Sequence, residues 1–92
     1  MSKYFIEVEH DEADQDCIKA VEIFMQTGSH FLTNADWGCM DGEHKAWIIM
    51  DAEDREQARC MLPSAYRQQA KVIQLNKFTL EEIQEIKREH AL

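Results

Sequence analysis

An Asp-Gly pair near the middle of the chain, at Asp41 and Gly42, restricts how these 92 residues can fold more than any other feature. Asp-Gly favours a type I′ turn, because both central residues of that turn need a positive φ angle. The stretches on either side, His30–Cys39 and His44–Asp51, carry the β-branched and aromatic residues that are typical of strands. The sequence therefore predicts an antiparallel hairpin at the centre of the molecule.

The register of this hairpin follows from its turn. With the Asp-Gly pair at the tip, Trp37 pairs with Ala46 and Cys39 pairs with His44. Paired residues point to the same side of a sheet, with Cβ atoms about 5 Å apart. The side that contains these four residues is mostly apolar, so we expect helices to cover it. Its members are Phe31, Thr33, Ala35, Trp37, Cys39, His44, Ala46, Ile48 and Met50.

Periodicity predicts the elements on both sides of the hairpin. Lys3–His10 alternates between apolar and polar residues, which is typical of a strand, and Lys71–Phe78 reads as another strand. Helices are expected at Asp11–Thr27 and at Glu53–Leu62, because their apolar residues recur at helical spacing. Pro63 ends the second helix.

The end of the chain predicts a further helix. Thr79 and Glu82 have the spacing of a capping box, which marks a helix start. The order of elements is then strand–helix–strand–strand–helix–strand, followed by this C-terminal helix. This is the α+β, ferredoxin-like βαββαβ arrangement, with a four-stranded antiparallel sheet and two helices on one face. We expect residues 1–92 to form one ferredoxin-like domain.

The chain length, the order of elements and the short first strand, "YFIEVEH", resemble the dimeric α+β barrel superfamily over about residues 3–78. In that superfamily two ferredoxin-like sheets face each other across a dimer. Its members include muconolactone-isomerase-like proteins, small monooxygenases and a small nickel-binding branch. The resemblance lies in topology and includes no shared catalytic motif. It therefore implies a dimer of this fold and assigns no functional residue.

Composition limits the partners and the compartment. The net charge of −8 predicts a surface that repels nucleic acids and anionic membranes. We find no apolar run of about 18 residues that predicts a membrane span, and no secretory signal. Three cysteines at irregular spacings argue against a disulfide framework and for a reducing, cytoplasmic setting. A domain this small has a thin core, so we expect a homo-oligomer, in the simplest case a dimer.

Four potential metal ligands converge on one corner of the predicted fold. His10 ends the first strand at the sheet edge where the hairpin turns, and Cys39 and His44 flank that turn on the same side. Cys17 lies on the inward stripe of the first helix, which begins at the same edge. Two thiolates and two imidazoles suit tetrahedral zinc, and this ligand set also suits nickel, copper or iron. We therefore predict a small binding protein with a transition-metal site, zinc or nickel, at the hairpin corner.

Other roles for these residues stay open at the level of sequence. A buried cysteine such as Cys17 is often an ordinary core residue, and a histidine at a strand end is often solvated. Cys17 and Cys39 could instead form a redox pair if they approach within disulfide geometry. Nearby acids could add a carboxylate ligand or orient the imidazoles; they are Asp11, Asp14, Asp41 and Glu43.

The uncovered face of the sheet offers a different kind of site. We expect Glu7, Glu9 and Asp36 on this face, together with Gln74 and Asn76 of the last strand. Burial against a second sheet would raise the pKa values of these carboxyl groups, as a general acid or base requires. The alternative function is therefore a cofactor-free monooxygenase or isomerase with an unknown small-molecule substrate. A third function is a structural or regulatory oligomer without a ligand, in which the polar residues form a wet interface.

Overall fold

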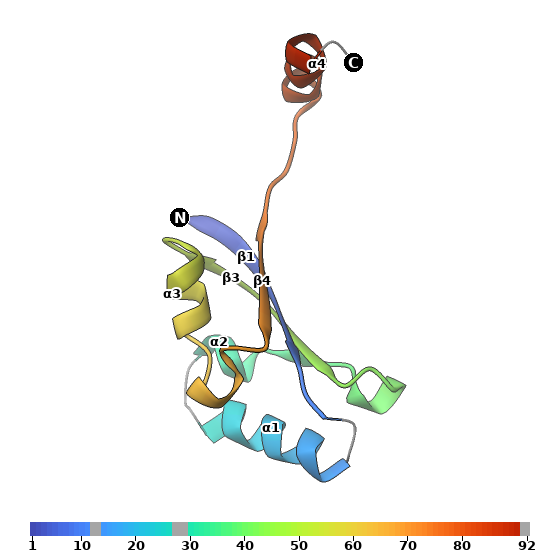
Figure 1. Cartoon of the computed structure of the whole chain (residues 1–92), viewed down its shortest axis with the longest axis vertical. Helices are drawn as coiled ribbons and strands as arrows, with labels where there is room; N and C mark the ends of the chain where they lie inside the picture. Colours follow the sequence, from blue (N-terminus) through green and yellow to red (C-terminus); the bar gives the residue numbers. More distant parts are fainter. Residues whose placement is uncertain (12–13, 27–29, 91–92) are drawn as a thin grey trace.

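The computed structural model describes residues 1–11, 14–26 and 30–90 (Figure 1). The strands are β1 (Ser2–Glu9), β2 (Asp36–Trp37), β3 (Lys45–Ala52) and β4 (Ala70–Leu75). The helices are α1 (Asp14–Gln26), α2 (His30–Thr33), α3 (Arg55–Cys60) and α4 (Leu80–His90). Two short 3-10 turns span Cys39–Asp41 and Ser64–Tyr66. No helix in the described part of the chain combines the length and the apolar character needed to cross a membrane.

The four strands form one antiparallel sheet in the order β2-β3-β1-β4. With the helices interleaved between the strands, this is the predicted α+β, ferredoxin-like fold, which is thereby confirmed. The central strand β1 sets the register on both sides: Ile6 lies opposite Ile48 of β3 and Val72 of β4. All three side chains are buried, so alternate positions of the three long strands build the core.

The core lies between the sheet and the helices α1 and α3. Phe24 of α1 is fully buried and packs edge-on against Trp37 and Tyr66, with ring centroids 5.0 Å and 5.6 Å apart. The face predicted to lie under helices does so in β3, where alternate residues are buried. Other buried members of the core are Tyr4, Val8, Ala20, Leu32, Ala46, Met50, Ala52, Ala58, Leu62 and Ala70.

The two covering helices correspond to the predicted ones with shorter bounds. Helix α1 lies within the predicted range Asp11–Thr27, of which residues 12–13 and 27 lie outside the described residues. Helix α3 lies within the predicted range Glu53–Leu62. It begins after Asp54, whose side chain accepts a hydrogen bond from the backbone N–H of Gln57 at 2.8 Å. This N-cap explains why α3 starts at Arg55.

The first half of the predicted hairpin is mostly not a strand, so that prediction was wrong. In place of a strand over His30–Cys39, the structure has the short helix α2 and only two strand residues, Asp36–Trp37. The side chain of Asn34 donates a hydrogen bond to the carbonyl of His30 at 3.0 Å. Local bonds of this kind compete with strand pairing, and Asn, Asp and Gly are poor strand formers.

The turn of the hairpin is also longer than the predicted two-residue turn. Cys39–Asp41 forms a 3-10 turn, and Gly42, which follows it, adopts a positive φ of 86°. Asp41 is therefore not part of a type I′ turn. The predicted pairing of Trp37 with Ala46 is nevertheless present. The strands thus keep the predicted register, although a longer loop with a 3-10 turn takes the place of the two-residue turn.

Strand β4 presents the opposite face from the one predicted. Ile73 lies opposite Phe5 and Leu75 lies opposite Lys3, so these residues share the uncovered face of the sheet. Gln74 therefore points to the other side, contrary to the prediction. Asn76, which was also expected on the uncovered face, lies beyond the end of β4.

The reason lies in two adjacent apolar residues, Val72 and Ile73. Alternation alone cannot tell which of two such neighbours enters the core. Val72 lies opposite Ile6, and both side chains are buried. Because successive side chains of a strand point to opposite faces, Ile73 lies on the uncovered face. Gln74 shares the side of Val72 but remains exposed, and it donates a hydrogen bond to the hydroxyl of Ser2 at 3.3 Å.

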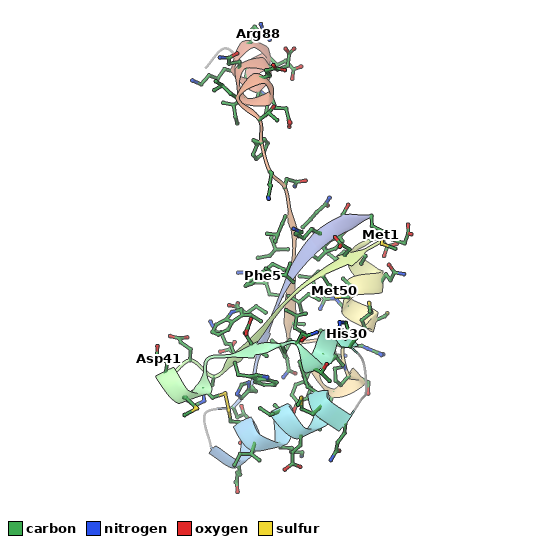
Figure 2. The ribbon with its side chains drawn as sticks, turned by 180° about the vertical axis from the view of Figure 1, so that it is seen from behind. Met1, Phe5, His30, Asp41, Met50 and Arg88 are labelled. Atoms are coloured by element: carbon green, nitrogen blue, oxygen red, sulfur yellow. A yellow bond between two sulfur atoms is a disulfide. The ribbon has the colours of Figure 1, made fainter. Side chains whose placement is uncertain are left out.

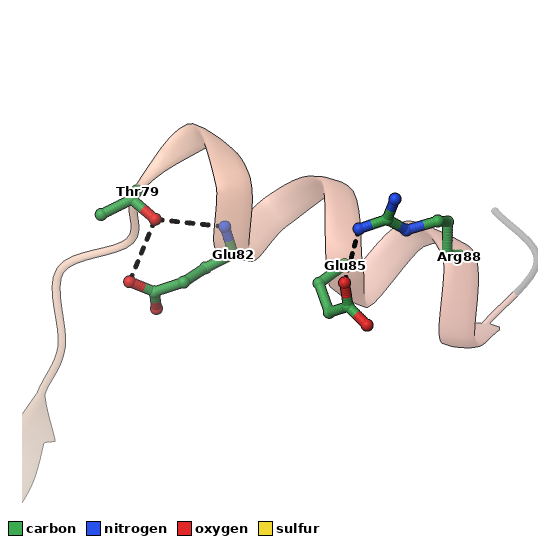
Figure 3. Close-up of polar contacts among 4 residues, drawn as sticks. All are labelled: Thr79, Glu82, Glu85 and Arg88. Carbon is green, nitrogen blue, oxygen red and sulfur yellow. Dashed lines mark hydrogen bonds and ion pairs between the residues drawn. The ribbon is translucent and has the colours of Figure 1, made fainter.

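Helix α4 begins where the capping box predicted. The hydroxyl oxygen of Thr79 accepts a hydrogen bond from the backbone N–H of Glu82 at 3.1 Å, and the hydroxyl group donates to the Glu82 carboxylate at 3.1 Å (Figure 3). One turn later, Arg88 pairs with Glu85. The helix stands apart from the body at the end of an extended segment, residues 76–79 (Figure 1), and none of its residues is buried.

Candidate metal centre

The four predicted ligands meet at one corner of the fold. His10 follows the end of β1, Cys17 lies on α1, Cys39 begins the 3-10 turn after β2, and His44 precedes β3. One ligand atom from each residue, an imidazole nitrogen or a sulfur, lies within 4.8 Å of each of the others. The structure thus brings together all four side chains that the sequence placed at this corner.

This spacing is close to what a tetrahedral metal ion needs. Zinc binds sulfur at about 2.3 Å and nitrogen at about 2.0 Å, so its four ligand atoms lie roughly 3.4–3.8 Å from one another. In the disulfide form the sulfurs of Cys17 and Cys39 are bonded to each other, so reduction must separate them before the four ligand atoms can adopt that arrangement. Two sulfurs with two imidazole nitrogens are also a ligand set found in structural zinc sites.

The backbone holds the two imidazoles side by side. The N–H of His10 donates to the carbonyl of His44 at 3.0 Å, which extends the pairing of β1 and β3 by one step. The two rings have centroids 6.0 Å apart. The indole of Trp37 packs edge-on against His10, with centroids 5.8 Å apart. An aromatic ring therefore closes the corner on the core side.

The loop that carries Cys39 depends on a glycine with no room for a side chain. A Cβ atom at Gly38 would lie 2.6 Å from the indole of Trp47 and 2.8 Å from the carbonyl oxygen of Glu43. The N–H of Gly38 also donates to the carbonyl of Lys45 at 3.1 Å. Any other residue at this position would push the loop away from the indole and displace Cys39.

Burial keeps one imidazole neutral. His10 is only 8 % exposed. Desolvation lowers the pKa of His10 below its ordinary value, and the neighbouring His44 lowers it further. The carbonyl of Val8 and the carboxylates of Asp11 and Asp16 act in the opposite direction but do not cancel the shift. The neutral imidazole, which is the form that binds a metal, therefore predominates at neutral pH.

Both imidazoles have a buried nitrogen without a hydrogen-bond partner among the described residues. These atoms are Nδ1 of His10 and Nδ1 of His44. The carbonyl of Val8 favours the charged form of His10, but its geometry falls short of a hydrogen bond to Nδ1. Leaving such an atom unpaired costs about 1–3 kcal/mol. Two orphaned nitrogens in one corner fit a site that takes a further partner.

Two of the four residues are covalently joined in the structure. Cys17 and Cys39 form a disulfide that ties α1 to the hairpin loop, and the yellow bond in Figure 2 shows it. Their Cα atoms lie 6.8 Å apart, and Nε2 of His10 lies 3.0 Å from the sulfur of Cys39. Neither sulfur is a thiolate in this state, so neither can bind a metal.

The disulfide differs from the expectation of three reduced cysteines. Cys17 and Cys39 do approach within disulfide distance, as the alternative required, and they are bonded to each other. The irregular spacing of the cysteines gave no sign of it, because the fold joins residues that are 22 positions apart. Cys60, which had no predicted role, is free and exposed.

A hollow of about 760 Å³ opens beside His10 at the end of β1. Tyr66 contributes to its wall, and burial, with a smaller effect of Asp16, raises the pKa of this phenol, so it stays protonated. An acidic lining raises the local concentration of cations beside His10, which is the one candidate ligand that lines the hollow. Three acidic residues and one basic residue line the hollow: Glu9, Asp11, Asp16 and Lys19.

The carboxylates expected to support the site do not contact it in the described structure. Asp11, Asp41 and Glu43 are exposed, and no described hydrogen bond joins them to either imidazole. The side chain of Asp14 lies outside the described residues. Asp11 acts on His10 only through its charge.

Neither the hollow beside His10 nor the hollow on the uncovered face brings together the three carboxylates of the alternative enzymatic site, since only Glu9 lines one of them. Glu7 accepts a hydrogen bond from Nε1 of Trp47 at 3.1 Å and lies 3.8 Å from Nζ of Lys45. Glu9 and Asp36 are exposed. The hollow on the uncovered face contains none of the three, since its lining is Lys3, Ile49, Leu75, Asn76 and Lys77.

Comparison with known proteins assigns no function to this site. No family model matches the chain, and neither a curated protein nor a solved structure matches it. The resemblance to the dimeric α+β barrel superfamily therefore stays a prediction.

Sequence reasoning missed the residues that shape the corner. It treated Trp37 as an ordinary core residue, although its ring lies against His10. It also gave no role to Gly38, whose signal was its place in a predicted hairpin flanked by two tryptophans. A glycine in that setting can mark a close approach of an aromatic ring to the backbone. The acidic hollow had no signal in the sequence, because its lining comes from three separate segments.

Proposed function

We propose that this protein binds one divalent transition-metal ion, zinc in the first place, between His10, Cys17, Cys39 and His44 when its thiols are reduced. The observation that carries the proposal is the meeting of four ligand atoms within 4.8 Å of one another. Four protein ligands complete a tetrahedral zinc ion and leave no position for a substrate. The site is therefore of the structural or sensing kind rather than the catalytic kind.

Three properties of the corner support this proposal. Burial and the neighbouring His44 favour the neutral form of His10, as a metal requires. Each imidazole has an unpaired buried nitrogen, so each ring has a free atom to offer or to orient. The hollow beside His10 has an acidic lining, which attracts cations to this ligand.

The disulfide adds a redox step to the proposal. A low-molecular-weight disulfide, such as oxidised glutathione, removes two electrons from the thiolates of Cys17 and Cys39. The protein S–S bond forms, the S–S bond of the reagent breaks into two thiolates, and the metal leaves as a free divalent ion. The oxidised, metal-free end of this exchange corresponds to the disulfide form in the structure.

The proposal includes a location. The thiol form persists where glutathione and thioredoxin keep cysteines reduced, as they do in the cytoplasm. We therefore propose that the metal-loaded form is cytoplasmic and that an oxidative shift unloads it.

Metal analysis of the reduced, untagged protein tests the site. We expect one zinc ion per chain by mass spectrometry of the metal after gel filtration under argon. Cobalt(II) should give the visible and sulfur charge-transfer bands of a tetrahedral thiolate site. Cys39→Ser should abolish both signals. Cys60→Ser is the matched control, because Cys60 is free and exposed.

Two results would overturn the metal proposal. The first is reduced wild-type protein without stoichiometric metal, and the second is equal metal content in Cys39→Ser and wild type. The redox step has its own test, in which oxidised glutathione is added to zinc-loaded protein. Zinc should reach a chromophoric indicator as the Cys17–Cys39 bond appears by mass spectrometry. Disulfide formation with the metal retained would reject the exchange.

A further inference from the structure

Helix α4 has the local features of a well-formed helix but no tertiary partner among the described residues of its own chain. Its N-terminus is capped by Thr79, its first turn is acidic and its last turn is basic, in agreement with the helix dipole. None of its 11 residues is buried. A helix this short is marginal in water on its own, and helices in proteins gain most of their stability from packing. The helix therefore lacks the contact that would stabilise it.

The apolar residues of α4 lie on a single stripe. Leu80, Ile83 and Ile86 are spaced by three residues, so they fall within about 120° of the helix circumference. Leu80 is 73 % exposed. Glu82 and Glu89 border the stripe on the side of Ile86, and Lys87 lies within the stripe near Leu80. The helix thus offers an apolar ridge with an acidic margin.

The uncovered face of the sheet is the second apolar surface without a partner. Phe5, Ile49 and Ile73 form one row across β3, β1 and β4, and Leu75 lies one step further along the same face. Ile49 is 60 % exposed, which is unusual for a large apolar residue in the middle of a long strand. Contiguous exposed apolar surface of this kind marks an interaction site.

The shape and charge of this face fit the ridge of α4. A hollow of about 570 Å³ lies on the face, with Ile49 and Leu75 in its wall. Lys3 and Lys77 also line it, so its margin is basic. An apolar hollow with basic margins is complementary to an apolar helix stripe with an acidic margin.

We propose that α4 of one chain docks, through Leu80, Ile83 and Ile86, on the uncovered sheet face of a second copy of the chain, and that the exchange is reciprocal. Reciprocal exchange of an identical element closes a two-fold dimer. The apolar stripe of α4 and the apolar row on the uncovered sheet face would then both be buried. The proposal does not depend on the metal site.

The segment between β4 and α4 favours a second copy over the same chain. Residues 76–79, "NKFT", continue away from the sheet in the direction of β4 (Figure 1), so the helix lies beyond its own face. They contain no Gly or Pro, the residues that reverse a chain in a short turn. Short, extended connections of this type are typical of exchanged elements.

Light scattering with size-exclusion chromatography on oxidised, metal-free protein tests the proposal. Wild-type protein should have twice the chain mass of 10.8 kDa. Ile83→Glu should raise the dimer dissociation constant by roughly a hundredfold or more, because two buried anchors are lost per dimer. Gln84→Glu adds the same charge and the same helix former at an exposed neighbouring position, so it should remain dimeric.

A mixing experiment identifies the two surfaces. Ile49→Glu damages the receiving face and leaves α4 intact, whereas Ile83→Glu does the reverse. Each variant alone should be monomeric, while a mixture should form a heterodimer with one intact contact, visible by native mass spectrometry. Far-UV circular dichroism confirms that each variant is folded. If Ile49→Glu does not fold, Lys77→Glu at the margin of the hollow replaces it and should weaken the dimer.

Several outcomes would overturn the proposal. A monomeric wild type at its solubility limit would mean that α4 has no partner copy or folds back on its own chain. A dimer that tolerates Ile83→Glu but not Ile49→Glu would instead indicate two sheets packed face to face. Two monomeric variants that do not complement each other would also reject the exchange.

Discussion

The two ends of this molecule are held in opposite ways. At the hairpin corner, His10, Cys17, Cys39 and His44 come from separate segments and are positioned by burial, ring packing and a disulfide. At the other end, α4 is specified by neighbours three residues apart, such as Thr79 with Glu82. The corner depends on the whole fold, and α4 depends on its own sequence. Perturbations of each end should therefore separate cleanly within the single chain.

Removing the buried ring of Phe24 should have the largest effect on the free energy of unfolding. Phe24 is fully buried and contacts Trp37 and Tyr66, so Phe24→Ala should lower the free energy of unfolding by about 3–5 kcal/mol. Urea unfolding followed by far-UV circular dichroism measures it. Met40→Ala is the control, because Met40 is exposed at the tip of the loop, and it should change the value by less than about 0.5 kcal/mol. A loss below about 1 kcal/mol for Phe24→Ala would contradict a corner held by packing.

Removing the covalent link should have the second largest effect. In oxidised, metal-free protein, Cys17→Ser combined with Cys39→Ser opens a loop of 22 residues in sequence separation. Chain entropy predicts a loss of about 3 kcal/mol in the free energy of unfolding. Cys60→Ser should leave it unchanged, since that thiol is free. Equal free energies of unfolding for the double variant and the control would show that the disulfide adds no stability beyond that of packing.

Thr79→Ala should weaken α4 and leave the corner intact. Loss of the N-cap costs about 1 kcal/mol of helix stability. The Cα chemical shifts of residues 80–90 should move towards coil values in dilute protein, while the signals of the core stay in place. Thr79→Ser keeps the hydroxyl group and should keep the helix. If the signals of the core shift as well, the stability of α4 and that of the corner are not independent.

A smaller effect is expected from pH in the oxidised, metal-free protein. The folded pKa of His10 is lowered by burial and by His44, whereas in the unfolded chain it lies at about 6.5. Below that value the unfolded chain takes up the proton first, so the free energy of unfolding should fall as the pH drops through 6.5 and level off below the folded pKa. The facing carboxylates of Asp11 and Asp16 moderate this loss.

Matched histidine variants assign the pH effect. His10→Asn should flatten the dependence of the unfolding free energy on pH between about 7 and 5. His90→Asn is the matched control, because His90 is exposed on α4 and takes no part in the corner. An unchanged slope in His10→Asn would assign the effect to another group.

Much of the fold was predictable because its signals are local. Alternation located β1 and β3, helical spacing located α1 and α3, and a capping box placed the start of α4. The errors fell where local signals are weak or ambiguous. Residues 30–39 contain Asn, Asp and Gly, and they form a helix and a two-residue strand. In β4, the adjacent Val72 and Ile73 left the facing side undecided, and only packing against Ile6 decides it.

The convergence of the four candidate ligands was predictable from topology. In a ferredoxin-like sheet the end of β1, the hairpin turn and the start of α1 share one edge, which places His10 and Cys39 together. The disulfide was not predictable in the same way. The distance between two sulfurs depends on the loop conformation, and the loop is shaped by the indole of Trp47 over Gly38. Such a contact leaves no periodic signal.

The placement of the two tryptophans has an optical consequence. They are the only tryptophans in the chain, and they approach the corner from opposite sides of the sheet. Trp37 lies against His10, and Trp47 covers the glycine that precedes Cys39. Residues 80–92 contain no tryptophan or tyrosine. Intrinsic tryptophan fluorescence therefore reports on the corner end of the molecule. Changes at the corner can be followed without a label, because α4 contributes no signal.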